Sequence, residues 1–141
     1  MPKVNTEFLN EKLLESTDIK NFLENNTENF RMDSFHHFLY DLIEKSGRKN
    51  SEIFSHANLS ESYGYQLLNG TRQPSRDKII QLAIGFPLTI NETNIMLKLA
   101  EKSQLYVKNK RDAIIIFALN KKLSMVELNA LLFEEGCEIL E

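Results

Sequence analysis

The chain has 141 residues, 42% of them hydrophobic, and a formal net charge of −3 at pH 7, which suits a small domain whose core needs no disulfide or metal. Its single cysteine cannot form an internal disulfide, and no Cys/His cluster has metal-ligand spacing, so we expect no metal or other cofactor. The longest apolar run, residues 113–119, is too short to span a membrane and no signal-peptide pattern opens the chain, so we expect a cytoplasmic protein without membrane contact.

The N-terminal third of the chain predicts helices. Glycine and proline are few and no β-alternation persists, so an all-α protein is expected throughout. Residues 6–30 carry apolar side chains at helical spacing, with a cap-like break at Ser16–Asp18, and predict one or two short helices. The next helix is expected from Ser34 to Ser46, where an apolar stripe faces a core, and Gly47 suits its end.

The middle of the chain predicts four short helices, at residues 51–57, 61–68, 76–85 and 91–103. Asn58 suits a left-handed turn between the first two, Leu59 is expected in the core, and Ser60 is expected to cap the second helix. Gly70 permits a sharp exit from that helix, and Pro74–Ser75 opens the next.

The C-terminal part predicts two more helices, at residues 111–121 and from Ser124 to Gly136, with Ser124 and Glu127 at capping-box spacing. Residues 113–119 are too apolar on all sides for an isolated surface helix. The two helices are therefore expected to form a unit that either packs on the rest of the chain or makes a subunit interface. The basic segment Lys108–Asp112 before them either contacts DNA backbone or caps a helix.

Charge is unevenly distributed. Residues 1–44 carry four basic and nine acidic side chains, residues 45–122 carry thirteen and six, and residues 123–141 carry none and five. A centre of +7 thus lies between two flanks of −5 each. Such a centre is typical of a protein that binds a polyanion, although uneven solvation of the surface gives the same pattern. No catalytic arrangement of Ser, His and Asp and no Gly-rich phosphate loop stands out, so no enzymatic activity is expected.

The most specific pattern lies in residues 50–75, which end in LNGTRQPS at residues 68–75. Here the chain resembles the XRE (lambda repressor/Cro-like) family of helix-turn-helix transcriptional regulators, over about residues 35–99. The resemblance implies a lambda-repressor-like helix-turn-helix domain at residues 31–104, with an N-terminal helical extension at 1–30 and a C-terminal helical pair at 105–141. It implies sequence-specific binding of double-stranded DNA by a transcriptional regulator, with repression as the favoured output.

The resemblance also assigns roles to residues, because the family inserts its second motif helix into the major groove. Contacts with bases or the groove fall to Ser62, Tyr63, Tyr65, Gln66 and Asn69. Gln66 is favoured for direct readout, since glutamine pairs bidentately with adenine N6 and N7. Contacts with phosphate fall to Lys49, Asn50, Ser60, Thr71, Arg72, Arg76 and Lys78. The alternatives are solvated charges at Arg72 and Arg76, and packing of one of the two tyrosines.

Two residues depart from the family pattern. Phe54 stands where the family usually has a small alanine, and Gly64 where it usually has a branched apolar residue. We expect the Phe54 ring to fill the space beside Gly64, although a glycine in a helix interior costs about 1 kcal/mol relative to alanine. Leu68 replaces a frequent glutamate and is expected to pack.

A second function stays open, because about half of the chain lies outside the family domain and the helix expected at 61–68 has no Lys or Arg. In this alternative the protein is an interaction module, antitoxin-like or an adaptor, whose acidic flanking helices bind a partner protein. A homodimer is favoured, because one small helix-turn-helix usually needs a second copy to read a DNA site.

Overall fold

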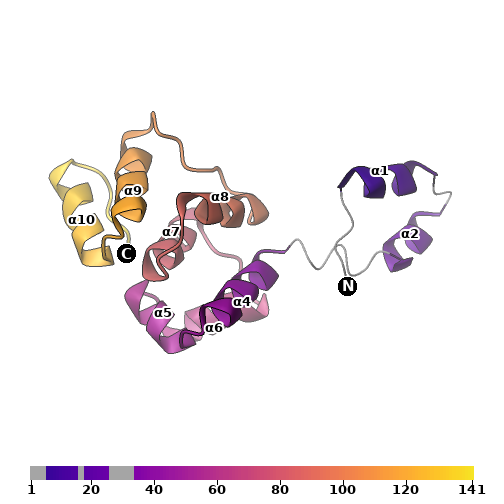
Figure 1. Cartoon of the computed structure of the whole chain (residues 1–141), viewed down its shortest axis with the longest axis horizontal. Helices are drawn as coiled ribbons and strands as arrows, with labels where there is room; N and C mark the ends of the chain where they lie inside the picture. The colour runs from indigo at the N-terminus through magenta and orange to yellow at the C-terminus, as the bar shows by residue number, and fades with distance from the viewer. Residues whose placement is uncertain (1–5, 16–17, 26–33) are drawn as a thin grey trace.

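The computed structural model describes residues 6–15, 18–25 and 34–141, and every regular element in these ranges is an α-helix (Figure 1). The N-terminal part holds α1 (Thr6–Glu15) and α2 (Ile19–Asn25). The following helices are α4 (Phe35–Ser46), α5 (Asn50–His56), α6 (Glu61–Asn69), α7 (Arg76–Gly85), α8 (Ile90–Leu99), α9 (Lys110–Lys121) and α10 (Met125–Glu134). The prediction of an all-α protein is thus confirmed for the described residues. None of their helices is long and apolar enough to cross a membrane.

Capping residues explain where several helices begin. The hydroxyl groups of Ser60 and Ser75 each accept the backbone N–H three residues further on, so α6 and α7 begin directly after them. Ser124 and Glu127 form a complete capping box at the start of α10. Gly47 and Gly70 end α4 and α6 in the left-handed conformation. These boundaries confirm the predictions from the sequence.

The helix expected at residues 91–103 is shorter than predicted, because α8 ends at Leu99. Glu101 adopts a φ of +60°, which stops helical continuation. The carbonyls of residues 103 and 104 point to the guanidinium of Arg76 and accept hydrogen bonds from it. These carbonyls are therefore satisfied by a distant side chain instead of by helical N–H groups.

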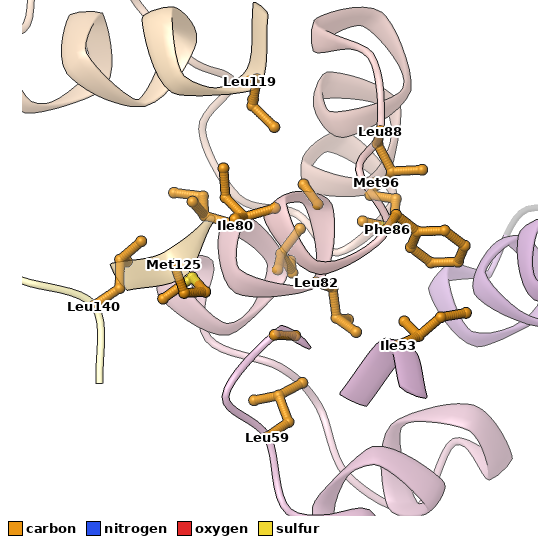
Figure 2. Packing of buried hydrophobic residues seen from close by; sticks show 14 of the residues in the cluster. Ile53, Leu59, Ile80, Leu82, Phe86, Leu88, Met96, Leu119, Met125 and Leu140 are labelled. Carbon is orange, nitrogen blue, oxygen red and sulfur yellow. The ribbon is translucent and has the colours of Figure 1, made fainter. Parts of the chain in front are cut away.

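Helix α7 lies at the centre of the fold, and every residue from Ile79 to Gly85 is buried. It contacts α5, α8, α9 and α10. Figure 2 shows Ile80 and Leu82 of α7 in one hydrophobic cluster with Leu59 from the turn after α5 and Met125 from α10. Apart from Gln81, which donates to the Ala57 carbonyl at 2.9 Å, residues 79–85 carry no polar side chain, so this part of α7 must be covered on all sides.

The C-terminal helices share this core with the earlier ones. One hydrophobic cluster includes Ile53 of α5, Ile80 of α7 and Leu128 of α10, and it extends to Leu140 beyond the last helix. The described side chains of α1 and α2 are all exposed or partly exposed, and none belongs to this cluster. The core of residues 34–141 therefore holds none of the described side chains of α1 and α2.

Candidate nucleic-acid interface

A tight turn joins α5 to α6. Asn58 has a φ of +59°, as the sequence predicts. The N–H of Leu59 donates to the Phe54 carbonyl at 2.9 Å, and that of Asn58 to the Ser55 carbonyl at 3.1 Å. This pair of bonds is the Schellman arrangement, in which the apolar residue after the left-handed one covers the end of the helix. Leu59 is buried accordingly, and the turn fixes the direction in which α6 leaves.

The crossing of α5 and α6 depends on Phe54 and Gly64. A Cβ atom at Gly64 would lie 2.5 Å from Cδ2 of the fully buried Phe54 ring, closer than real side chains approach. The Phe54 ring also meets the edge of Tyr65, with 5.6 Å between ring centroids. The predicted packing is therefore confirmed: the Phe54 ring on α5 occupies the space beside Gly64 on α6.

The outward side of α6 carries most of the residues assigned to base or groove contact. Ser62, Tyr65 and Asn69 are exposed, and their spacing of three and four residues places them on one helix face. Tyr65 is 46% exposed, whereas Tyr63 is half-buried and packs against the core. Burial raises the pKa of Tyr63, while nearby Arg72 acts in the opposite direction. One tyrosine thus packs and the other faces outward.

Five of the assigned residues meet where α6 ends: Tyr63, Gln66, Asn69, Thr71 and Arg72. We call them the α6-end cluster. The Asn69 side-chain oxygen accepts from the N–H and the hydroxyl of Thr71, at 3.0 and 2.7 Å. Arg72 Nε donates to Oε1 of Gln66 at 2.9 Å, and its guanidinium lies 5.4 Å from the centroid of the Tyr63 ring. The loop after α6 therefore folds back on the helix and joins residues of both.

Three further residues assigned to phosphate lie at the starts of α5 and α6. Lys49 is the exposed residue before α5, and Asn50 is its first, half-buried residue. The Ser60 oxygen accepts from the N–H of Tyr63 at 3.1 Å, and its hydroxyl proton stays available as a donor. Exposed N–H groups and the helix dipole favour anions at these ends.

Arg76 has a different environment from the one predicted. Its guanidinium donates to both carboxylate oxygens of Asp112, at 2.9 and 2.8 Å, and to the carbonyls of Ser103 and Gln104. The Asp112 side chain is only 7% exposed, so this ion pair is largely buried. The assignment of Arg76 to phosphate is corrected accordingly, because its N–H donors are used inside the fold. Lys78 differs from Arg76, because it donates one exposed hydrogen bond to a main-chain oxygen of Glu141 and keeps two further donors.

A second ion pair lies beside the first. Arg111 donates to both oxygens of Asp77, at 2.9 and 3.0 Å. The dipeptides Arg76-Asp77 and Arg111-Asp112 lie in the first turns of α7 and α9, and each arginine binds the aspartate of the other dipeptide. We call this arrangement the crossed Arg–Asp pairs. It was not foreseen from the sequence, because its partners are 34 and 36 residues apart.

The segment Lys108–Asp112 acts as a helix start. The Asn109 side chain accepts the N–H of Asp112 at 2.9 Å, which caps α9, and Lys110 donates to the carbonyl of Glu135 at 2.8 Å. Burial opposes ionisation of Asp112, but hydrogen bonds from Arg76 and from the Tyr106 N–H keep the pKa of Asp112 below its usual value. The crossed Arg–Asp pairs use two cations and two anions of the basic centre, so its net charge of +7 is unchanged while two of its arginines are bound inside the protein.

Within the described residues, no group of three or more His, Cys, Asp or Glu side chains is placed to hold a metal ion. Comparison of the chain with protein-family models, with curated proteins and with solved structures finds no match.

Proposed function

We propose that this protein binds double-stranded DNA at specific sequences, as a cytoplasmic transcriptional regulator similar to the XRE family, with repression as its output. The observation that carries the proposal is the α6-end cluster together with the exposed face of α6. Polar, aromatic and cationic groups gather there on a short helix that α5 holds through the Phe54–Gly64 contact.

The exposed side chains of α6 support binding in a DNA major groove. The groove is about 12 Å wide and admits one α-helix with its side chains. Ser62, Tyr65 and Asn69 line the face, and Gln66 lies beside them. Hydroxyl and amide groups are those that pair with base edges, and an aromatic ring contacts the thymine methyl group. In the proposed complex this face supplies the selectivity.

Contacts with the DNA backbone come from the residues around that face. Lys49 and Arg72 supply positive charge, and Asn50 and Ser60 supply neutral hydrogen-bond donors. The N–H and hydroxyl of Thr71 both donate to Asn69, so Thr71 orders the loop and would have to exchange a bond to reach a phosphate. With Arg76 used inside the fold and Lys78 bonded to Glu141 at the surface, one copy of the chain has few free cations beside α6. We therefore expect one copy alone to bind DNA weakly.

A second copy of the chain would double these contacts, and we propose a homodimer through the C-terminal helices. Phe117 on α9 and Phe133 on α10 are 50% and 78% exposed. Ile114, Phe117 and Leu131 line an apolar hollow of about 390 Å³ between these helices. Phe117→Glu is expected to convert the dimer to a monomer in analytical ultracentrifugation, with Lys121→Glu as a charge control on the same helix. A wild-type chain that sediments as a monomer at high concentration would contradict the dimer.

Selection of bound sequences from random duplex DNA tests the DNA proposal. We expect one enriched motif, and a binding constant that falls linearly with salt on logarithmic axes. Gln66→Ala should relax the preference at one base pair and leave the rest of the motif. Sequence-independent binding, or none at moderate salt, would count against the proposal.

A partner protein is the second candidate function, and the N-terminal helices favour it. Leu13, Leu14 and Ile19 are exposed, with Leu14 at 86%, on helices that also carry acidic residues. Apolar side chains exposed at this level on an acidic helix suit a complementary basic and apolar surface. Co-purification of a specific protein that Leu14→Asp abolishes, without enrichment of any DNA motif, would favour this function.

A further inference from the structure

The side-chain amide of Gln66 is held by Arg72. A glutamine amide has one oxygen that accepts and one nitrogen that donates twice. The oxygen, Oε1, accepts from Arg72 Nε at 2.9 Å. The N–H of Arg72 also donates to the main-chain carbonyl of Gln66, at 3.3 Å. Two contacts therefore join the same two residues. Arg72 takes one of the two lone pairs of Oε1 and places its positive charge beside the other, whereas the amide nitrogen of Gln66 keeps both of its donors for a ligand.

Tyr63 supports the arginine in this position. The guanidinium carbon of Arg72 lies 5.4 Å from the centroid of the Tyr63 ring, and the ring itself is held by packing against the core. A guanidinium over an aromatic face gains a cation–π attraction and loses freedom of rotation. The Gln66–Arg72 pair is thus supported from the core side by Tyr63.

We infer that Gln66 and Arg72 act together to recognise guanine, whereas a glutamine alone would recognise adenine. This inference rests on the proposed function. Adenine offers an acceptor at N7 and a donor at N6, so it needs both the oxygen and the nitrogen of the amide. The Gln66 oxygen faces Arg72 instead. An adenine amino group placed there would meet the N–H groups of the guanidinium.

Guanine suits the same unit, because its major-groove edge offers two acceptors, N7 and O6. The amide nitrogen of Gln66 and the remaining guanidinium nitrogens of Arg72 present only donors toward such an edge. Cytosine offers a donor at N4 and is disfavoured, and thymine offers the single acceptor O4. Arg72 is thus a positioning residue for Gln66 as well as a cation near phosphate.

The test is selection from random duplex DNA with the full chain and four variants: Gln66→Ala, Gln66→Glu, Arg72→Ala and Lys49→Ala. The base pair at which Gln66→Ala loses preference identifies the position that Gln66 reads. We expect the wild type to favour guanine over adenine there by about tenfold, the scale of one good bidentate pair. Gln66→Glu, which keeps a partner for Arg72 but has no donor, should lose this preference.

Arg72→Ala separates a positioning role from a charge effect. It frees the Gln66 oxygen, so the preferred base should change from guanine to adenine at that position alone. Lys49→Ala removes the same charge and should weaken binding without changing any base preference. A wild-type preference for adenine there, or an unchanged preference in Arg72→Ala, would overturn the inference and leave DNA binding intact. Absence of any enriched motif would overturn the proposed function and this inference with it.

Discussion

The loop after α6 and the first turn of α7 each carry an arginine, and the two environments are opposite. Arg72 is exposed, and its side chain contacts Gln66 and Tyr63 on the surface of α6. Arg76, four residues later, is 24% exposed and donates four hydrogen bonds, two of them to the buried Asp112. The same residue type therefore contributes to a surface available to a ligand in one place and to stability in the other.

The two arginines differ because of the groups that their guanidinium groups contact, and not because of where they stand in the chain. An exposed contact between polar side chains contributes little to stability, because water competes for the same groups. A buried carboxylate that loses its partner leaves an uncompensated charge in the core, which is costly. Breaking the contacts of the loop after α6 should therefore cost little stability, whereas breaking those at the junction of α7 and α9 should cost much.

The largest effect is expected for Arg76→Met, which should lower the free energy of unfolding by about 3 kcal/mol. Asp112 would stay buried without its guanidinium, and two carbonyls would lose their donor. Denaturant unfolding measures the change. Arg72→Met is the matched control and should change stability by less than about 0.5 kcal/mol. Equal losses for the two variants would abolish the contrast between the regions.

Gly64→Ala is expected to lower the free energy of unfolding by about 1–2 kcal/mol, although alanine is the better helix former. The added methyl group would overlap the buried Phe54 ring, which lies 2.5 Å from its position. Thermal or denaturant unfolding shows the loss. The double variant Phe54→Leu/Gly64→Ala should recover part of it, and additivity of the two single changes would argue against direct contact.

Arg76 is expected to matter more than Arg72 for stability, and Arg72 more than Arg76 for DNA binding. Arg72→Ala is expected to reduce the slope of the binding constant against salt concentration, on logarithmic axes, by about one. A chain carrying Arg76→Met should keep the wild-type slope under conditions where it is folded, because that arginine is used inside the protein. Titrations at several salt concentrations measure both slopes. A lower slope for Arg76→Met would return this residue to the phosphate contacts.

The smallest expected effect is a change in stability at acidic pH, caused by protonation of Asp112. Arg76 and the Tyr106 N–H lower the pKa of Asp112 in the folded state below its usual 3.8, despite burial. The unfolded chain therefore binds the proton first, and the stability that Asp112 contributes is present above about pH 4 and lost as the pH falls through the folded pKa. The difference in stability between the wild type and Asp112→Asn should narrow in that range. A constant difference down to pH 2 would show that Asp112 does not titrate as described.

Much of the candidate site was predictable because it depends on neighbours in the chain. The left-handed turn at Asn58, the cap at Ser60 and the end of α6 at Gly70 each involve groups only a few residues apart. The contact between Phe54 and Gly64 was also predicted, because an unusually large residue and an unusually small one stood at a helix crossing. The role assigned to Arg76 was misplaced for the opposite reason, since its partner Asp112 lies 36 residues further along the chain.

Turn residues and caps thus determine where helices begin and end from the sequence alone, because left-handed backbone and first-turn N–H groups need only a local residue of the right kind. Which arginines stay exposed depends on packing. Asp112 meets Arg76, and Asp77 meets Arg111, only because α9 lies against the buried α7. Pairing across 34 to 36 residues costs the entropy of closing a long loop and is formed only when the apolar core holds both helices together.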